Sequence, residues 1–351
     1  MSGATSDGAR RLFRRGARWL DRLVGDADWK HAALKPAVLQ CAMPARLAAA
    51  RYGAGPAGAR ERERRFLEAS TSYREAMADN RPDARQTTAT TIDGLTWWVP
   101  LTRPDDAHAI ERSLGHQNFP YRAITQTREL GIGRIMLDIG GNTGRTAIPR
   151  VVLGDVRAAY CAEPDPLNYA CLVRNIRDNG LRGLVMPDRV AIGAENAVGR
   201  LLRAKSAGGH KLIDPGVHVA GDAIEVSCLT LDTWCERLGV DPREVSFVKV
   251  DAQGSEAHVL RGASRLLQMR HVAWQIEIDL ALLAERGSEA ALFGLLQQHF
   301  THWIDLNRRA TGPRLQRISQ LEARLGYLRA RRRGRTDILA FSLDLSPKVT
   351  S

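Results

Sequence analysis

The sequence has few cysteines and no long apolar run, and both shortages exclude classes of protein. Its five cysteines, Cys41, Cys161, Cys171, Cys228 and Cys235, form no C-x-x-C pair and no zinc-ligand spacing. We therefore expect reduced, buried thiols rather than a disulfide framework or a zinc site. No apolar stretch approaches the roughly 18 residues that a membrane-spanning helix needs, and no signal-type apolar core follows the start. These absences predict a soluble, cytoplasmic protein, and 351 residues suffice for a large core.

A complete dinucleotide-binding fingerprint is also missing. Ile135–Gly144 reads IMLDIGGNTG, an apolar run around Asp138 followed by three glycines. This order predicts a buried strand, a tight turn and a helix start, with backbone amides able to approach a ligand. The pattern G-x-G-x-x-G does not fit, because Asn142 and Arg145 occupy two of its glycine positions. A ligand without a phosphate fits this turn better, and an ordinary strand-to-helix turn is the alternative.

Three further apolar runs predict the neighbouring strands of a parallel sheet. Arg157–Glu163 ends in an acid at a strand end, where a carboxylate can accept both hydroxyls of a ribose. A solvated carboxylate is the alternative for Glu163. Leu184–Ile192 fits a strand whose end, at Ala191, passes beside an adenine, and Val245–Val250 ends in Asp251.

Five ordered motifs, together with a fainter one near the end, give the chain a family resemblance. They are Asp138-Ile-Gly140-Gly141-Asn142-Thr143-Gly144, Ala162-Glu163-Pro164, Asn175, Thr230-Leu231-Asp232, Lys249-Val-Asp251-Ala-Gln253-Gly-Ser255-Glu256, and Thr336–Phe341. From about Ile135 to Gly262 the chain resembles the FkbM-type methyltransferases. It departs from them at Gln253, where the family often has Glu, and at Ser255, where it often has an aromatic residue.

The resemblance implies an α/β fold with a class I methyltransferase, Rossmann-like sheet, mostly parallel with an antiparallel last strand. It also implies S-adenosylmethionine as cofactor and methylation of a hydroxyl on a sugar, glycolipid or polyketide. From the motifs and the strand ends we expect these cofactor-binding residues: Asp138, Gly140, Gly141, Asn142, Thr143, Gly144, Glu163, Pro164, Asn168, Ala191 and Asp251.

Methyl transfer from a sulfonium requires alignment and removal of a proton from the accepting oxygen. Asp251 is the first candidate base, and Lys249, two residues earlier on the same strand face, and Glu256, at the start of the next helix, are the other predicted catalytic residues. Asp251, Glu256 and Glu277 are an alternative magnesium site, which we do not favour because their spacing is not distinctive. The Asn/Asp-Pro-Pro-aromatic motif of base-amine methylation is absent after Asp251, and this favours oxygen as the acceptor.

The net charge of +12 is concentrated in two segments. Residues 1–65 carry +8 and residues 307–336 carry +9, so the rest is mildly acidic. Arg10–Val24 has apolar and basic faces suited to an anionic membrane or a partner, although packing on its own core is the alternative. An RNA-directed methyltransferase and a non-catalytic or nicotinamide-binding Rossmann protein remain open, but a nucleic-acid enzyme would more naturally be basic around its cleft.

The expected organisation is a basic helical extension over 1–83 and a methyltransferase domain over 84–351 with an Arg-rich insertion at 308–335. Gly199–Ala204 and Ala223–Cys228 predict an added hairpin or edge strands. The polar residues of the interval Gly193–Val226, His210, Lys211, Asp214 and His218, either recognise substrate or form a plain exposed loop. The other expected elements are a hairpin over Thr87–Pro100, an N-cap at Asp232, helices over Arg60–Asn80, Leu167–Asn179, Gly254–Leu267, Ala290–Phe300 and Leu315–Leu328, and strands over His271–Ile278, Trp303–Leu306 and Asp337–Leu343. Phe119, Tyr121 or Arg122 can line the site, but packing is the favoured role of these aromatic residues.

Overall fold

A computed structural model describes residues 56–78, 86–92, 95–101, 135–152, 156–204, 208–213, 221–306, 315–330 and 334–342. The expected basic helix at Arg10–Val24, Cys41, the residues Phe119, Tyr121 and Arg122, and the polar residues Asp214 and His218 lie outside these ranges. Among the described helices none is both long and apolar enough to cross a bilayer. The four cysteines in the described ranges are free and buried.

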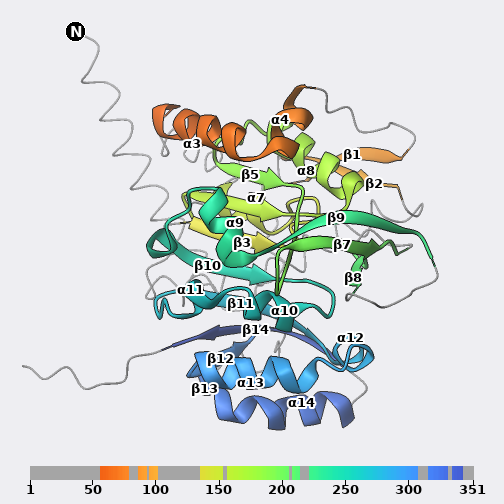
Figure 1. Ribbon diagram of the computed structural model, residues 1–351, viewed down its shortest axis with the longest axis vertical. Coiled ribbons are helices and arrows are strands. Elements are labelled where there is room, and N and C mark those ends of the chain that lie inside the picture. Colours follow the sequence, from red (N-terminus) through yellow and green to blue (C-terminus); the bar gives the residue numbers. More distant parts are fainter. Residues whose placement is uncertain are drawn as a thin grey trace, which may run out of the picture.

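An eight-stranded sheet forms the centre of the described structure (Figure 1). Its strands are β3 (Ile135–Ile139), β4 (Ala158–Ala162), β5 (Val185–Asp188), β10 (Val245–Val250), β11 (Ala273–Asp279), β12 (His302–Asp305), β13 (Leu315–Arg317) and β14 (Arg335–Phe341). Their order is β13-β12-β14-β11-β10-β3-β4-β5. The run from β11 to β5 is parallel, and β14 lies antiparallel between β11 and β12. The mostly parallel sheet with an antiparallel last strand is confirmed.

Helices cover both faces of this sheet because its parallel strands are apolar on both sides. Met136 and Phe247 pack against α7 (Ala147–Val152) and the inner side of α8 (Pro166–Asp178). The opposite face, which includes Leu137, belongs to the larger core. The helices of this larger core are α9 (Leu231–Arg237), α10 (Glu256–Arg261), α11 (Ser264–Leu267), α12 (Leu280–Glu285), α13 (Glu289–His299) and α14 (Leu321–Ala330). Short 3-10 turns occur at Pro242–Glu244 and Ile318–Gln320.

A second sheet has the order β6-β9-β7-β8. Its strands are β6 (Ala191–Gly193), β7 (Ala197–Leu202), β8 (Lys211–Ile213) and β9 (Ala223–Thr230). The expected added hairpin is therefore present, as antiparallel β7 and β9 with β8 beyond β7. The single strand predicted over Leu184–Ile192 is wrong: β5 ends at Asp188, and β6 joins the second sheet. The carboxylate of Asp188 is held by Ser70 and Trp234, and these distant partners fix the chain where it turns.

Two N-terminal helices, α3 (Pro56–Ala69) and α4 (Thr71–Ala78), pack near β5 and α8 (Figure 1). They replace the single helix expected over Arg60–Asn80. The helical pattern is interrupted at Ser70, whose hydroxyl donates to the carboxylate of Asp188 at 2.6 Å and accepts the backbone N–H of Tyr73. Phe66 and Tyr73 belong to the main core.

The expected hairpin before the sheet is present as β1 (Thr87–Ile92) and β2 (Leu95–Pro100). Trp97 is buried and Trp98 half-buried, as alternation predicts. Two amides of α8 bind the backbone of β2. Asn175 accepts from the N–H of Trp98 and donates to its C=O, and Asn179 does the same with Thr96. Residues four apart on a helix and two apart on a strand are both about 6 to 7 Å apart, so the two spacings match.

Three other expectations are corrected by contacts from distant segments. The helix predicted over Gly254–Leu267 is two helices with Gly262 between them, where an added Cβ would lie 2.2 Å from the carbonyl oxygen of Gly193. The N-cap of α9 is Thr230, and Asp232 instead accepts from Ser264 and the backbone of Arg265. The helix predicted over Leu315–Leu328 begins as strand β13, which pairs with β12.

Candidate active site

A cavity of about 290 Å³ opens at the carboxyl ends of β3, β4 and β10. This volume is close to the lower end of the range for small-molecule sites, about 300–1,000 Å³. Its walls come from the glycine turn after β3, the β4–α8 turn, the β5–β6 segment, the second sheet and the turn after β10. The lining residues include Gly140, Gly141, Asn142, Arg145, Thr146, Glu163, Pro164, Asn168, Val190, Ala191, Leu201, His210, Leu212, Lys249, Asp251, Gln253, Ser255 and Arg335.

The glycine turn is fixed by its neighbours on both sides. The backbone N–H groups of Gly140 and Gly141 both donate to the carbonyl of Ala162 at 3.0 Å. Gly140 has φ of +77°, and a Cβ there would lie 2.0 Å from the carbonyl oxygen of Asp251. Only glycine satisfies both conditions at this position. The turn therefore brings the ends of β3, β4 and β10 to one edge of the cavity.

Glu163 follows β4 directly and lines the cavity, as the strand-end argument predicts. Its carboxylate accepts the backbone N–H of Asn142 at 2.7 Å and that of Asp165 at 3.0 Å. Burial raises the pKa of Glu163 to about 7, although both backbone bonds favour the charged form. The side-chain amide of Asn168 also donates to Glu163, with 3.5 Å between Nδ2 and Oε1. A carboxylate has about four acceptor positions, so one remains beyond these three bonds. The side chain is oriented from two directions and keeps the capacity to accept a ligand hydroxyl.

Lys249 and Asp251 form an ion pair on the β10 side of the cavity, with 2.9 Å between Nζ and Oδ2. Burial alone would raise the pKa of Asp251, but the ammonium group of Lys249 and hydrogen bonds hold it well below its usual range. Burial would lower the pKa of Lys249, and the charges of Asp251 and Asp138 raise it instead. Asp251 is therefore a carboxylate and Lys249 a cation near neutral pH.

Gln253 joins this pair to a second carboxyl group. Its Nε2 donates to Asp251 at 2.8 Å and to Glu277 at 3.0 Å, and Arg335 donates to Glu277 at 2.6 Å. Burial and the charge of Asp251 raise the pKa of Glu277, against the opposing effect of Arg335. Gln253 adopts a positive φ of 50°, which is uncommon outside glycine. Its amide can donate to both carboxyl groups, which a glutamate at this position could not do while ionised.

Asp138 is buried beneath the cavity rather than at its surface. It pairs in register with Lys249, so both side chains lie on the same face of the sheet. Neither carboxylate oxygen makes a hydrogen bond of normal geometry with the described residues, and the amide of Ala147 has only a small effect. Burial raises the pKa of Asp138 to about 6, in spite of Lys249. The charge of Asp138 in turn contributes to the raised pKa of Lys249.

Most of the predicted site residues meet in the cavity, but four do not. Gly140, Gly141, Asn142, Glu163, Pro164, Asn168, Ala191, Lys249 and Asp251 line it, whereas Asp138, Thr143, Gly144 and Glu256 lie behind its wall. Glu256 accepts the backbone N–H groups of Ala252 and Gly254 and so holds the turn after β10, and burial raises its pKa to about 7. Leu201, Leu212 and Arg335 were not predicted.

The alternative magnesium site has no support from side-chain geometry. Glu277 binds Gln253 and Arg335, and Glu256 binds backbone amides. In the described ranges no group of three or more His, Cys, Asp or Glu side chains is placed to hold a metal ion.

The strand order, the antiparallel β14 and a cavity at the carboxyl ends of β3, β4 and β10 define a class I methyltransferase fold. Residues 138–311 match the model of the methyltransferase FkbM domain. The chain therefore carries a methyltransferase domain of the FkbM family, as the motifs predicted.

Solved structures with similar folds are distant in sequence. Methyltransferase FkbM from Methylobacillus flagellatus KT is 16% identical, with a TM-score of 0.37 over 60% of this chain and 44% of that chain. TYW2 of M. jannaschii in complex with AdoMet is 10% identical, with a TM-score of 0.30 over 73% and 85% of the two chains. The B. subtilis tRNA methyltransferase TrmK is 10% identical, with a TM-score of 0.34 over 63% and 65%. The present chain thus spans less than half of the Methylobacillus protein. A search of curated proteins found no significant match.

Proposed function

We propose that this methyltransferase binds S-adenosylmethionine in the cavity and transfers its methyl group to a hydroxyl oxygen of a sugar, glycolipid or polyketide-type metabolite. The observation that carries the proposal is Glu163, a buried carboxylate that lines the cavity at the end of β4 and is oriented by two backbone amides. A fixed acceptor of this kind suits the two hydroxyls of a ribose.

The remaining walls fit the other parts of the same molecule. Val190 and Ala191 offer an apolar surface for a flat base next to the ribose. The glycine turn runs from Gly140, which lies against Asp251, to Asn142, which binds Glu163. We place the methionine part and the reacting methyl group on the Asp251 side of this turn, near Lys249. When bound, the cofactor supplies a methyl group activated by a positively charged sulfur.

Asp251 is the proposed proton acceptor. It is a weak base, because Lys249 lowers its pKa. An alcohol becomes far more acidic as its oxygen bonds to the methyl carbon, so a correctly placed weak base suffices late in the reaction. Lys249 and Gln253 hold the carboxylate through its two oxygens, one each. We expect Lys249 to position Asp251 rather than to move a proton itself.

Calorimetric titration of the purified chain with S-adenosylmethionine and, separately, with NAD tests the cofactor. We expect selective binding of S-adenosylmethionine. Glu163→Gln should weaken it about tenfold or more, because one charge-assisted acceptor is lost. Asp305→Asn is the matched control, since Asp305 is a buried acid at the end of β12 that does not line the cavity. Binding of NAD alone, or of neither ligand, would contradict the proposal.

The acceptor class is tested with S-adenosylmethionine that carries a labelled methyl group. Incorporation of the label into hydroxyl-rich glycans and polyketides is compared with its incorporation into RNA. Two described arginines of the insertion are in ion pairs, Arg324 with Asp305 and Arg329 with Glu289. The charge of these two side chains is therefore less available to an RNA backbone. Label incorporation into RNA alone would select the RNA-directed alternative.

A further inference from the structure

Arg335 is a cation in the wall of the cavity whose orientation is fixed by a buried partner. It is the first residue of β14, and its Nε donates to Oε1 of Glu277 at 2.6 Å, with Nη2 in contact with the same oxygen. The side chain of Arg335 is 59% exposed and lines the cavity, whereas that of Glu277 is 4% exposed. The buried carboxyl group therefore holds one edge of the guanidinium group and leaves the rest of it accessible.

The guanidinium group of Arg335 keeps both donors and charge for a further partner. It has five N–H donors in one plane, and the contacts with Glu277 use only Nε and Nη2. With the residues of the described ranges, Arg335 makes no other hydrogen bond. Burial and the charge of Asp251 raise the pKa of Glu277, so this carboxyl group neutralises the arginine only in part. The exposed edge of Arg335 is suited to an anionic group.

The strand order places Arg335 beyond the proposed site of methyl transfer. The strands β4, β3, β10, β11 and β14 are successive neighbours, and adjacent strands are about 4.8 Å apart. Glu163 follows β4 and Asp251 follows β10, so the proposed cofactor extends from β4 to β10. An in-line displacement requires the acceptor oxygen on the side of the methyl carbon opposite to the sulfur, which is bonded to the ribose half. We therefore expect the acceptor to approach from the side of β11 and β14.

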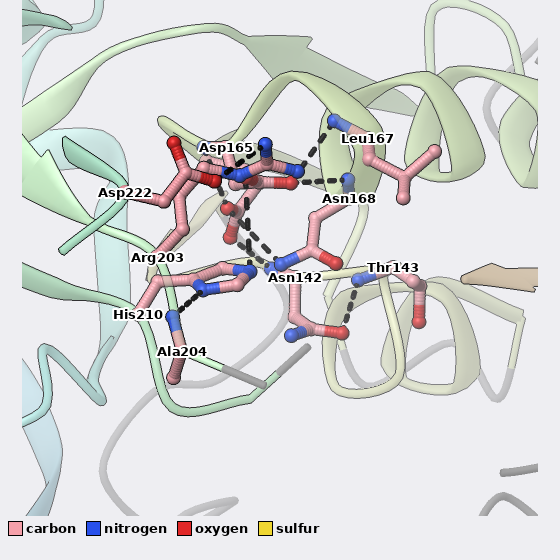
Figure 2. A network of polar contacts seen from close by, with 10 residues as sticks. Asn142, Thr143, Asp165, Leu167, Asn168, Arg203, Ala204, His210 and Asp222 are labelled. Atoms are coloured by element: carbon pink, nitrogen blue, oxygen red, sulfur yellow. Dashed lines mark hydrogen bonds and ion pairs between the residues drawn. The ribbon is translucent and has the colours of Figure 1, made fainter. Parts of the chain in front are cut away.

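Two other arginines near the cavity lie on the side of the glycine turn and the second sheet. Arg145 lines the cavity and donates to the side chain of Asn142 at 3.1 Å. Arg203, directly after β7, binds the buried carboxylate of Asp165 at 3.0 Å and Asp222 at 3.2 Å (Figure 2). These contacts belong to the walls of the proposed cofactor site. A cation that faces the acceptor therefore comes from β14 rather than from these two side chains.

We propose that Arg335 binds an anionic group, a carboxylate or a phosphate, of the methyl acceptor, so that the acceptor is an acidic sugar or lipid rather than a neutral one. This inference rests on the proposed function, because the position of the acceptor follows from that of the cofactor. The planar guanidinium fork matches two oxygens of a carboxylate or of a phosphate. Glu277 is a positioning residue, since it fixes the orientation of the fork.

Three probes with related sugar rings separate charge from shape. Glucose is neutral, glucuronate carries a carboxylate, and glucose 6-phosphate carries a phosphate. Each is titrated by calorimetry into the full chain saturated with S-adenosylhomocysteine, which has no methyl group to transfer. We expect at least one of the two acids to bind about tenfold more tightly than glucose. A preference for glucuronate identifies a carboxylate as the anion, and a preference for glucose 6-phosphate identifies a phosphate.

Substitutions at position 335 test whether this arginine causes the preference. Arg335→Gln should weaken the preferred acid about tenfold and leave S-adenosylmethionine within about threefold of the parent. Arg335→Lys keeps a charge beside Glu277 and so protects the fold, but it loses the fork and should reduce the preference by about threefold. Arg157→Gln is the matched control. Arg157 directly precedes β4, pairs with Glu244, is 45% exposed and does not line the cavity.

Several outcomes would overturn the proposal and leave the proposed function standing. They are equal binding of glucose and both acids, no binding of either acid at millimolar concentration, and an unchanged preference in Arg335→Gln. An equally large loss of S-adenosylmethionine affinity in Arg335→Gln would also overturn it, because Arg335 would then hold the cofactor rather than the acceptor. If the parent chain bound neither S-adenosylmethionine nor S-adenosylhomocysteine, the proposed function itself would be overturned.

Discussion

Replacement of Asn175 by Ala should destabilise the protein and loosen the cofactor site together. The Asn175 side chain is fully buried and makes three hydrogen bonds, with the N–H of Trp98, the C=O of Trp98 and the C=O of Thr143. Each buried group left without a partner costs about 1–3 kcal/mol, and water can reach the half-buried Trp98. We therefore expect a loss of about 3 kcal/mol in the free energy of unfolding.

Asn179→Ala is a closely matched control. Its side chain also makes three hydrogen bonds, with the N–H and C=O of Thr96 and with the C=O of Asn175. It does not touch the glycine turn, whereas Asn175 binds that turn at Thr143. Both variants should lose similar stability, but only Asn175→Ala should bind S-adenosylmethionine more weakly, by about fivefold to tenfold.

Urea denaturation gives the two free energies of unfolding, and calorimetry at a temperature where both variants are folded gives the affinities. A loss below about 1 kcal/mol for Asn175→Ala would show that the bonds to β2 are not needed. An equal loss of affinity in both variants would refute the coupling through Thr143.

Three further outcomes follow from single positions. Gly140→Ala should abolish cofactor binding or folding, because the new Cβ would lie 2.0 Å from the carbonyl oxygen of Asp251. Gly294→Ala in α13 is the control, because a Cβ at this position has no other atom within 4 Å. This second variant should be more stable than the parent by about 0.5–1 kcal/mol in a thermal melt. Asp138 keeps its proton up to about pH 6 when folded but only to about 3.8 when unfolded, so its folded form binds more protons in this window. The free energy of unfolding should therefore fall by about 3 kcal/mol as pH rises through that range, and Asp138→Asn should remove this share in pH-dependent urea titrations. Affinity for S-adenosylmethionine should rise with pH up to about 7 as Glu163 ionises, and a parallel pH profile in Glu163→Gln would argue against Glu163 as the ribose acceptor.

The sequence located the strand-end residues well, because the carboxyl ends of parallel strands meet at one edge. This rule placed Glu163 and Asp251 in the cavity. It could not place Asp138, which is in register with Lys249 on the same face of the sheet but lies buried beneath the cavity. Alternation along a strand gives the face of a side chain but not how far along that face the cavity extends.

The parts of the site that sequence reasoning missed depend on pairing between distant segments. Leu201 and Leu212 line the cavity because β7 and β8 pair in one register. Arg335 reaches Glu277 across 58 residues because β14 pairs with β11. Pairing between strands that are far apart in the sequence leaves no pattern in either strand's own sequence, so it could not be predicted. The division of Leu184–Ile192 into two strands has the same origin, in contacts of Asp188 with Ser70 and Trp234.

The place of β14 in the sheet has a consequence for synthesis of the chain. β14 is the last strand in the described sequence, yet it lies between β11 and β12, and β12 is joined to the rest of the sheet through it. Its first residue, Arg335, also lines the cavity. A nascent chain that stops before residue 335 has two unpaired inner strand edges, which are exposed to aggregation and proteolysis. Completion of the sheet and completion of the active-site wall are therefore one event, so a prematurely ended product has neither a closed sheet nor a finished site.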